Sequence, residues 1–533
     1  MRKSKVGLTI LLIVIMLLAI VPMTAFAAGG EATANGVEYA TLAEALAQGG
    51  EVKLLKNVDV KSIIGINKST TLDLGDYTIT NHVEKERCFH VKADSFTINA
   101  GKGGMVIPSS NTHSYGFIRC DAVKNFTMSG GQYSGKTENG CFFRLTGGCS
   151  GAKVVLNQVN ASSNNELFQT SPSTLDKIDA TVIGGTYKTE TRAFYFDIID
   201  TKTSPIVFNG VNITADRGPC IELAGGKSTF ENCNFTVTGN FSGGYSWARA
   251  AIGLGYEANA TVKSGTYTAK SSAMGASEGY GAYIYTSGGT LLVEGGTFAG
   301  STAALKTSVD KSTYEKATST ITVQGGQFDG DLLTTDSGRE SITIHGGNFT
   351  GLTDETTKDT NELHIAGGSF NRSVREFVED SLDYELNNTG TYSYHKTIAD
   401  ALENAQSGAV IQPTQLQPGG ATFYRATLKY NDDIGTSVQI EADTDGKLVL
   451  PKISRDGYTF LGWADENDQT IAAGETVTLT KNQTFTATWK ALEKPPMMED
   501  LPQTGDNSMS VALLVLIAVI AVGGIVVLVR KKR

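Results

Sequence analysis

Three copies of one short pattern decide the fold: Gln324-Gly325-Gly326-Gln327-Phe328, His345-Gly346-Gly347-Asn348-Phe349 and Ala366-Gly367-Gly368-Ser369-Phe370. The aromatic residues of these copies are 21 positions apart, and earlier copies, at longer intervals of about 30 residues or more, end at Tyr133, Tyr187, Tyr267 and Phe298. A short alternating strand precedes each Gly pair, with its apolar members pointing inward. Such a period predicts stacked turns, because one turn alone cannot bury its apolar face.

A second family of apolar strands precedes the copies. Its members lie at residues 88–91, 116–119, 193–196, 220–223, 251–254 and 282–285. Two or three strands per turn of 21–32 residues predict an all-β chain. The expected fold is a parallel β-solenoid of about eleven or twelve turns. A β-sandwich array is the alternative, and it would need longer strands paired by tight hairpins.

The repeat pattern resembles the right-handed parallel β-helix family, also called pectin-lyase-like. That family contains pectate lyases, polygalacturonases and many adhesins. The resemblance implies a right-handed winding over residues 28–373.

Two similar segments have the pattern of capping helices. Thr41-Leu42-Ala43-Glu44 has the spacing of a capping box that opens a short helix, and residues 397–402 nearly repeat it. We expect the first segment to cap the N-terminal end of the solenoid. The second either closes the other end, within a connector at 374–421, or begins a vestigial solenoid.

Residues 422–490 form a further β-rich segment with two of the three Trp residues. The string Gly457-Tyr458-Thr459-Phe460-Leu461-Gly462-Trp463 resembles the internalin B-repeat (Listeria–Bacteroides repeat) family of small β-domains. The chain has Asn431-Asp432-Asp433-Ile434-Gly435 where that family usually has an Asn-Gly-Gly turn. We expect a small core around the aromatic residues, a spacer role for the domain, and a linker at 491–500.

The N-terminal segment 1–27 has the pattern of a secretory signal. Arg2, Lys3 and Lys5 precede an apolar run, and Ala25-Phe26-Ala27 is a small-x-small cleavage site. We expect cleavage between Ala27 and Ala28.

The C-terminal segment 501–533 contains Leu501-Pro502-Gln503-Thr504-Gly505, an uncharged run at 511–529 and a basic end at 530–533. The run spans about 28 Å as a helix, enough to cross the hydrocarbon core of a membrane. These features resemble the LPXTG sorting signal of Gram-positive cell-wall proteins. The resemblance implies that sortase cuts between Thr504 and Gly505 and joins Thr504 to a peptidoglycan precursor. The chain would cross the membrane only before sorting.

The composition narrows the function classes further. The 533 residues carry 45 basic and 55 acidic side chains, a net charge of −10, and 40% of the residues are hydrophobic. This acidic balance argues against a nucleic-acid partner, and the hydrophobic content argues against wholesale disorder. We expect no cofactor and no metal ion.

Carboxylates on the outer face of the second strand family are candidates for catalysis. The expected outward positions are His90, Arg119, Arg144, Tyr195, Asp197 and Glu222. If Asp197 and Glu222 lie one turn apart, their separation of about 5 Å would suit a retaining glycosidase. The alternative interpretation is a solvated charged face.

The long intervals between Phe235 and Phe298 are candidates for binding. Their extra residues carry Phe241, Tyr245, Trp247, Arg249, Tyr256 and Tyr280. Aromatic rings beside Gly and Ser suit sugar stacking or a protein contact. The alternative interpretation is that these rings cover the flank of the solenoid.

The six Cys residues lie in the first half of the solenoid without CxxC spacing, which argues against a zinc site. Cys141 and Cys149 are nearest in sequence, but the pairing is left open. Three functions follow: a sortase-anchored adhesin or binder of a glycan or host ligand, a polysaccharide lyase or glycoside hydrolase, or a structural surface component. We expect binding rather than catalysis.

Overall fold

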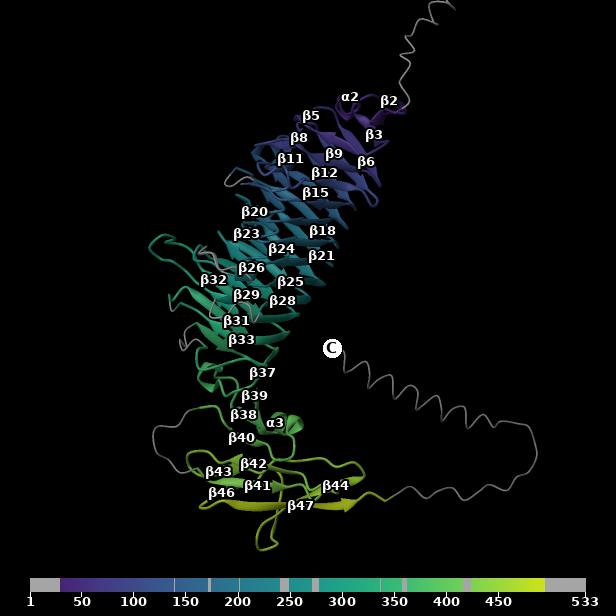
Figure 1. Ribbon diagram of the computed structural model, residues 1–533. Coiled ribbons are helices and arrows are strands. Elements are labelled where there is room, and N and C mark those ends of the chain that lie inside the picture. Colours follow the sequence, from purple (N-terminus) through teal and green to yellow (C-terminus); the bar gives the residue numbers. More distant parts are fainter. Residues whose placement is uncertain are drawn as a thin grey trace, which may run out of the picture. The chain divides into compact units, whose positions relative to one another are not determined.

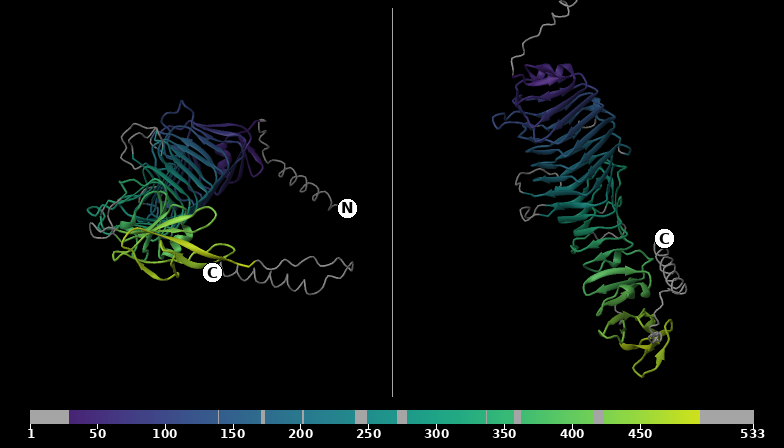
Figure 2. Two further views of the ribbon diagram at one scale, coloured as in Figure 1. Left: turned by 90° about the horizontal axis from the view of Figure 1, so that it is seen from below. Right: turned by 90° about the vertical axis from the view of Figure 1, so that its right-hand side faces the viewer.

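A computed structural model describes residues 29–493 except 139, 171–173, 201, 240–248, 271–277, 336, 357–361 and 416–422. The chain divides into two units, and the features discussed below lie in the larger one, which runs up to Ile453 and again from Gly462 to Thr488, except for strand residues 458–461 and 489–491. Figure 1 shows its strands stacked in sequence order, and Figure 2 shows two further views of the same strands.

The first sheet has fifteen strands, and all of them after β2 and β1 run parallel. In spatial order they are β2 (Val37–Tyr39), β1 (Ala32–Ala34), β3 (Gly50–Leu54), β6 (Thr70–Gly75), β9 (Ser95–Ala100), β12 (Asn125–Ser129), β15 (Ala152–Asn157), β18 (Ile178–Ile183), β21 (Pro205–Asn209), β24 (Lys227–Glu231), β27 (Ala258–Val262), β30 (Gly289–Val293), β32 (Ser319–Val323), β34 (Glu340–Ile344) and β36 (Leu363–Ile365). The parallel part holds more strands than the eleven or twelve turns that the repeats predict, and the turns after β3, β6 and β9 lack a Gly-Gly-aromatic copy.

The second sheet is a parallel stack that contains the repeat aromatics. Its strands are β4 (Val58–Val60), β7 (Thr78–Asn81), β10 (Gly104–Val106), β13 (Gln132–Ser134), β16 (Asn160–Ser163), β19 (Thr186–Thr189), β22 (Asn212–Ala215), β25 (Cys233–Val237), β28 (Gly265–Ala269), β31 (Thr297–Thr307), β33 (Gln327–Leu333), β35 (Asn348–Phe349) and β37 (Ser369–Phe370).

The third sheet is the stack formed by the second strand family. Its strands are β5 (Ile64–Ile66), β8 (Arg87–Val91), β11 (Gly116–Cys120), β14 (Phe143–Leu145), β17 (Phe168–Thr170), β20 (Phe194–Asp197), β23 (Ile221–Ala224), β26 (Arg249–Gly255) and β29 (Gly279–Ile284), followed by the second half of β31. Three stacked parallel sheets from consecutive strands are consistent with the expected solenoid, and the hairpin-linked alternative is wrong for this region.

The repeat aromatics form one continuous register line inside the stack. Phe298, Phe328, Phe349 and Phe370 pair in successive strands and are buried. The same line runs back through Tyr267 and Tyr187 to Tyr133, with Ala161, Ile213 and Phe235 in the intervening strands. Intervals of 21 and of about 30 residues are therefore both single turns.

Gly326 shows why the repeat needs glycine. Its backbone has φ of +120°, a region that side chains disfavour. A Cβ atom at this position would lie 2.7 Å from the carbonyl oxygen of Gly296 in the preceding turn. The bend between the first and second sheets can therefore stack closely only without a side chain.

The predicted N-terminal helix is confirmed as α2 (Leu42–Gln48), with a complete capping box between Thr41 and Glu44. Leu42, Ala45 and Leu46 are buried, and the helix packs against β1, β2, β3 and β5. The antiparallel pair of β1 and β2 was not predicted. It covers the first edge of the stack and leaves no long parallel edge there.

The predicted second helix is confirmed as α3 (Ile398–Asn404), which Thr397 caps. A short 3-10 helix, η3 (Arg375–Phe377), and three strands accompany it: β38 (Tyr384–Asn388), β39 (Thr391–His395) and β40 (Val410–Pro413). Because β39 pairs antiparallel with β37, the parallel stack ends here. Antiparallel pairs, and not a further parallel turn, therefore follow β37.

The small β-domain contains β41 (Arg425–Lys429), β42 (Ser437–Glu441), β43 (Lys447–Val449), β44 (Tyr458–Ala464), β45 (Thr470–Ile471), β46 (Thr476–Thr478) and β47 (Gln483–Ala491). Its first hairpin joins β41 to β42, with Asn431 and Gly435 at positive φ. Trp463 is fully buried and donates a hydrogen bond of 2.7 Å from Nε1 to the Pro451 carbonyl oxygen. The predicted aromatic core is present in this part of the domain.

Candidate functional site

The third sheet presents a register line of polar side chains on its outer face. His90 pairs with Arg119, Arg119 with Arg144, and Tyr195 with Glu222, while Gln169 lies between Arg144 and Tyr195. Five of the six predicted outward positions therefore fall on one register line, although Glu222 is buried there. Asp197 lies on the same face, two residues further along β20.

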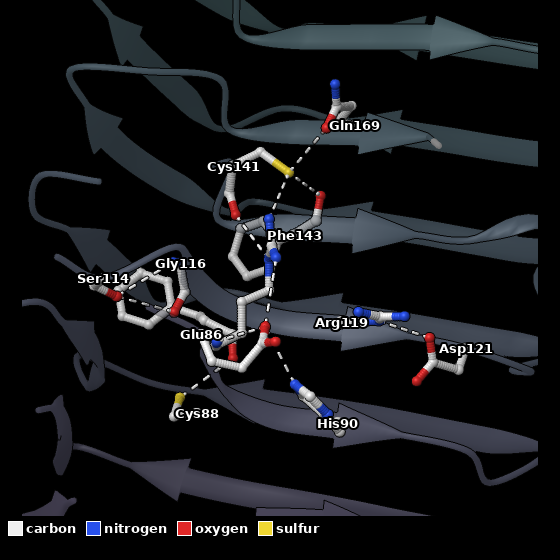
Figure 3. Close-up of polar contacts among 12 residues, drawn as sticks. Glu86, Cys88, His90, Ser114, Gly116, Arg119, Asp121, Cys141, Phe143 and Gln169 are labelled. Carbon is white, nitrogen blue, oxygen red and sulfur yellow. Dashed lines mark hydrogen bonds and ion pairs between the residues drawn. The ribbon is translucent and has the colours of Figure 1, made fainter. Parts of the chain in front are cut away.

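In the N-terminal part of this line, carboxylates lie next to the basic side chains (Figure 3). His90 Nε2 lies 3.3 Å from Glu86 Oε1, and Arg119 Nε lies 2.7 Å from Asp121 Oδ1. The pKa of Arg119 is raised, first by its hydrogen bond to Asp121. His90 and Arg119 thus each have a carboxylate within contact distance.

Asp197 and Glu222 lie one turn apart on the adjacent strands β20 and β23, but they are not directly opposed. The register pairs Glu222 with Tyr195 and Asp197 with Ala224, so the two carboxylates are offset by two residues along adjacent strands. The buried pairs Phe194–Ile221 and Phe196–Leu223 set this register. The separation of about 5 Å expected for a retaining pair rested on direct opposition.

Glu222 is held in a buried charge cluster. Its carboxylate pairs with the Arg192 guanidinium, which also lies 2.7 Å from Glu166 Oε1. Burial raises the pKa of Glu222, and Arg192 opposes this rise. Burial also disfavours charge on Arg192, but Glu166 and Glu222 outweigh it and raise the pKa of Arg192. The cluster therefore keeps its arginine charged.

Arg192 also contacts Tyr195, the residue that bonds to Asp197. The Arg192 guanidinium lies 3.8 Å from the centroid of the Tyr195 ring, a cation–π contact. The Tyr195 hydroxyl donates to Asp197 Oδ2 at 3.0 Å, and the Asp197 backbone N–H donates to Thr170 Oγ1 at 2.7 Å. These contacts fix Asp197 at the edge of a groove.

The groove has a volume of about 870 Å³. It opens where the outer face of the third sheet carries small residues, Ala224 on β23 and, in the next strand, Gly255. Its lining comprises Asp197, Ile198, Ile199, Ala224, Tyr256, Glu257, Ser287 and residues 312–317. Carboxylates, hydroxyls, an aromatic pair and short apolar side chains thus converge on one hollow.

Tyr256 and Tyr314 form the aromatic wall of this groove. Their ring centroids lie 6.0 Å apart with the planes at 88°, and Tyr256 is 55% exposed. The hydroxyls approach to 3.5 Å. This contact and partial burial raise the pKa of Tyr256 to about 12. Tyr256 therefore stays uncharged at neutral pH.

The turn that carries Tyr256 is strained. Tyr256 and Glu257 have φ of +51° and +59°, a conformation that costs non-glycine residues of order 1–3 kcal/mol each. The Tyr256 backbone N–H donates to Ser287 Oγ at 2.8 Å. Consecutive strained residues of this kind concentrate at functional sites.

The segment that carries Tyr314 is fixed by Asp310. The Asp310 carboxylate accepts hydrogen bonds from Ser312 Oγ at 2.6 Å, from Thr313 Oγ1 at 2.7 Å and from two backbone N–H groups. The Ser312 and Thr313 side-chain bonds lower the pKa of Asp310 to about 2. The Tyr314 backbone N–H donates to the Asp310 carbonyl oxygen at 2.8 Å, which completes the turn.

A second hollow of about 350 Å³ shares Glu257 with the groove. It is lined by Lys202, Glu257, Asn259, Gly289, Thr290 and Thr318. Asn259 and Thr290 are neighbours in register on β27 and β30 of the first sheet. The Tyr256–Glu257 turn therefore borders two polar hollows.

The residues predicted to bind a ligand lie in different surroundings in the structure. Tyr256 lies in the groove, and Arg249 is half-buried at the start of β26. Tyr280 is fully buried, with its hydroxyl donating to Glu278 at 2.6 Å, so its ring is withdrawn from the surface. Phe241, Tyr245 and Trp247 lie outside the described residues.

The sequence did not predict that Tyr314 lines a groove, nor that Asp197 lies in the same groove wall. The Asp310-Lys311-Ser312-Thr313 string has the composition of a side-chain-capped turn, and the interval from Phe298 to Phe328 exceeds the final period of 21. These two signals could have indicated a loop at Tyr314.

Comparison with known proteins identifies the C-terminal segment. Residues 493–533 match the family model described as the LPXTG cell wall anchor motif. No curated protein and no solved structure matches the chain. The chain is thus a secreted, extracellular surface protein anchored covalently to the cell wall, with sortase processing and peptidoglycan linkage implied by the motif.

The predicted span 511–529, the cleavage site at Ala27 and Ala28, and the motif Leu501–Gly505 lie outside the described residues. Across the part of the chain that the structure describes, no helix is long and apolar enough to cross a membrane.

Proposed function

We propose that this wall-anchored protein binds a saccharide in the groove beside Tyr256 and Tyr314. The proposal includes a right-handed β-helix at 28–373, a closing connector at 374–421, and a B-repeat-like spacer at 422–490 before the linker 491–500. Export by cleavage after Ala27 and cutting between Thr504 and Gly505 complete the expected route to the wall.

The exposed edge-to-face tyrosine pair is the observation that carries the proposal. Sugar rings present C–H faces that pack on aromatic rings, and their hydroxyls need nearby hydrogen-bonding groups. Asp197, Glu257 and Glu315 supply acceptors around the pair, while Ser287 supplies a hydroxyl. Because these three carboxylates outnumber Lys316, which also lines the groove, the combination fits a neutral or amino-bearing saccharide better than an acidic one.

Rigidity of the two tyrosine segments supports binding. Asp310 holds one turn through four hydrogen bonds, and Ser287 holds the other. A groove that is ordered before its ligand arrives loses less conformational freedom on binding. The strained turn at Tyr256 is consistent with a position kept for contact.

The alternative function is that of a polysaccharide lyase or glycoside hydrolase. The carboxylate of Asp197 on the groove wall favours this alternative. The buried ion pair of Glu222 with Arg192 disfavours Glu222 as the second group of a retaining pair.

A glycan array tests the proposal with protein released from cell walls by muralytic digestion. We expect binding to a defined saccharide set, with Tyr256→Ala and Tyr314→Ala each reducing affinity about tenfold. Tyr77→Ala is the matched control, because Tyr77 is an exposed tyrosine outside the groove lining. Equal binding by all variants would contradict the site, and release of shortened sugars would favour the enzyme.

A further inference from the structure

All six cysteines are buried and carry free thiols in this structure. The protein functions outside the cell, where disulfides form and persist more readily than in the cytosol. The positions of the thiols relative to one another therefore decide which pair can be oxidised.

Cys120 and Cys149 lie in neighbouring turns at the same corner of the solenoid. Cys120 ends β11, and its register partner is Leu145 at the end of the adjacent strand β14. Cys149 follows Leu145 by four residues and ends the short 3-10 helix η1 (Gly147–Cys149). The fold thus returns the chain to Cys120 after one turn.

The thiol of Cys149 touches the backbone of Cys120. Cys149 Sγ donates to the Cys120 carbonyl oxygen at 3.2 Å, and the Thr146 backbone N–H donates to that same oxygen at 3.0 Å. Each thiol is almost completely excluded from solvent. A disulfide requires the two Cβ atoms to lie about 3.5–4.5 Å apart, and rotation about each Cα–Cβ bond then turns the sulfur atoms toward each other.

The other four thiols bond to groups that are not cysteines. Cys141 Sγ lies 3.5 Å from the Phe143 carbonyl oxygen and 3.6 Å from Gln169 Oε1 (Figure 3). Cys88, Cys220 and Cys233 donate to the carbonyl oxygens of Phe117, Thr236 and Glu231. The fold therefore brings Cys149 to Cys120, although Cys141 is nearer in sequence.

We propose that Cys120 and Cys149 are a modification site that oxidation converts to a disulfide joining two successive turns. The oxidant is a small-molecule disulfide such as oxidised glutathione. One cysteine thiolate attacks it and releases a glutathione thiolate, and the second cysteine thiolate then displaces the remaining glutathione. Two protein thiols lose two electrons and two protons, and one glutathione disulfide becomes two thiols.

Burial determines when this oxidation occurs. Burial raises the pKa of the Cys149 thiol to about 11. Burial, and then the nearby Cys149, raise the pKa of the Cys120 thiol well above its ordinary value. Since the thiolate is the reactive form, the folded reduced protein oxidises slowly. The disulfide forms during folding, and the packed turns then shield it from reductants.

Thiol counting during refolding tests the proposal. The full chain is reduced, unfolded, refolded in a buffer of reduced and oxidised glutathione, and alkylated in denaturant. We expect four of the six cysteines to react, and proteolysis with mass spectrometry to find the Cys120–Cys149 linkage with a loss of two mass units. Six reactive cysteines, or a linkage between other residues, would overturn the proposal.

Variants separate this pair from accidental oxidation. Cys120→Ser and Cys149→Ser should each leave five reactive cysteines, while Cys233→Ser, the control, should leave three. If a serine variant fails to fold, the wild-type linkage map still decides the result. Protein extracted from cell walls in acid, which prevents thiol exchange, is mapped by the same proteolysis and mass spectrometry. It should contain the Cys120–Cys149 linkage, and the absence of this linkage would also contradict the proposal.

Discussion

Phe328 and Phe349, which lie one turn apart, stack with ring centroids 4.5 Å apart and planes at 10°. Phe298 and Phe370 extend this stack on either side, with centroid distances of 5.5 and 5.0 Å. The side chains that repeat in the sequence are thus the side chains that hold neighbouring turns together. Packing, and not hydrogen bonding alone, sets the position of each turn.

Replacement of a stacked ring should destabilise the C-terminal turns. Phe349→Ala leaves a cavity between Phe328 and Phe370, and we expect a loss of about 3–5 kcal/mol in the free energy of unfolding. Denaturant titration measures the loss. Thr343→Ala on the outer face of β34 is the control and should change stability little. Equal effects of the two variants would show that the ring stack is unimportant.

Arg192→Leu should destabilise the solenoid more than removal of a surface charge. The variant leaves the carboxylates of Glu166 and Glu222 without their shared partner, and breaking a buried pair costs about 3–5 kcal/mol. Lys124→Met breaks the exposed pair with Asp94 and should cost under about 1 kcal/mol. Comparable chemical denaturation midpoints for the two variants would contradict the importance of the buried cluster.

The Tyr314 turn should remain ordered to low pH. The folded-state pKa of Asp310 is lowered from 3.8 to about 2, so its stabilising contribution is present above pH 4 and is lost as the pH falls through about 2. Hydrogen exchange of the Thr313 amide follows this transition. Asp310→Asn should weaken protection at neutral pH and remove its acid dependence, and an unchanged profile would count against this role.

Wall attachment should depend on the threonine of the sorting motif. Thr504→Ala removes the residue at which the sortase cut is expected, so the chain should move from the peptidoglycan fraction to the membrane fraction. Fractionation and immunoblotting report the distribution. Ser508→Ala, just beyond the motif, is the control and should remain in the wall. Equal wall attachment of both variants would contradict sorting at this position.

The sequence predicted the parallel stacks because their inward residues repeat at one position in each turn. It also predicted both helices, since Thr41 and Thr397 occur at recognisable N-caps. The register of Asp197 and Glu222 was not predictable to one residue, because the inward pairs Phe194–Ile221 and Phe196–Leu223 determine it. Alternation alone does not say which apolar residues oppose each other.

The groove was only partly predictable, because its walls come from separate turns. Tyr256 and Tyr314 are 58 residues apart, and Asp197 is a further 59 residues before Tyr256. The search for aromatic residues in the long intervals between repeat copies found Tyr256, but it also selected Tyr280, which is buried. Only the three-dimensional stack shows which loop residues converge.

The central claim is that the tyrosine groove binds a saccharide, and calorimetric titration tests it most directly. The strongest saccharide from the array is titrated into wild-type protein and into the Tyr256→Ala/Tyr314→Ala double variant, with matching melting temperatures confirming that both are folded. We predict one site in the wild type and a Kd at least about tenfold weaker in the double variant. Equal Kd values for the two folded proteins would contradict the claim.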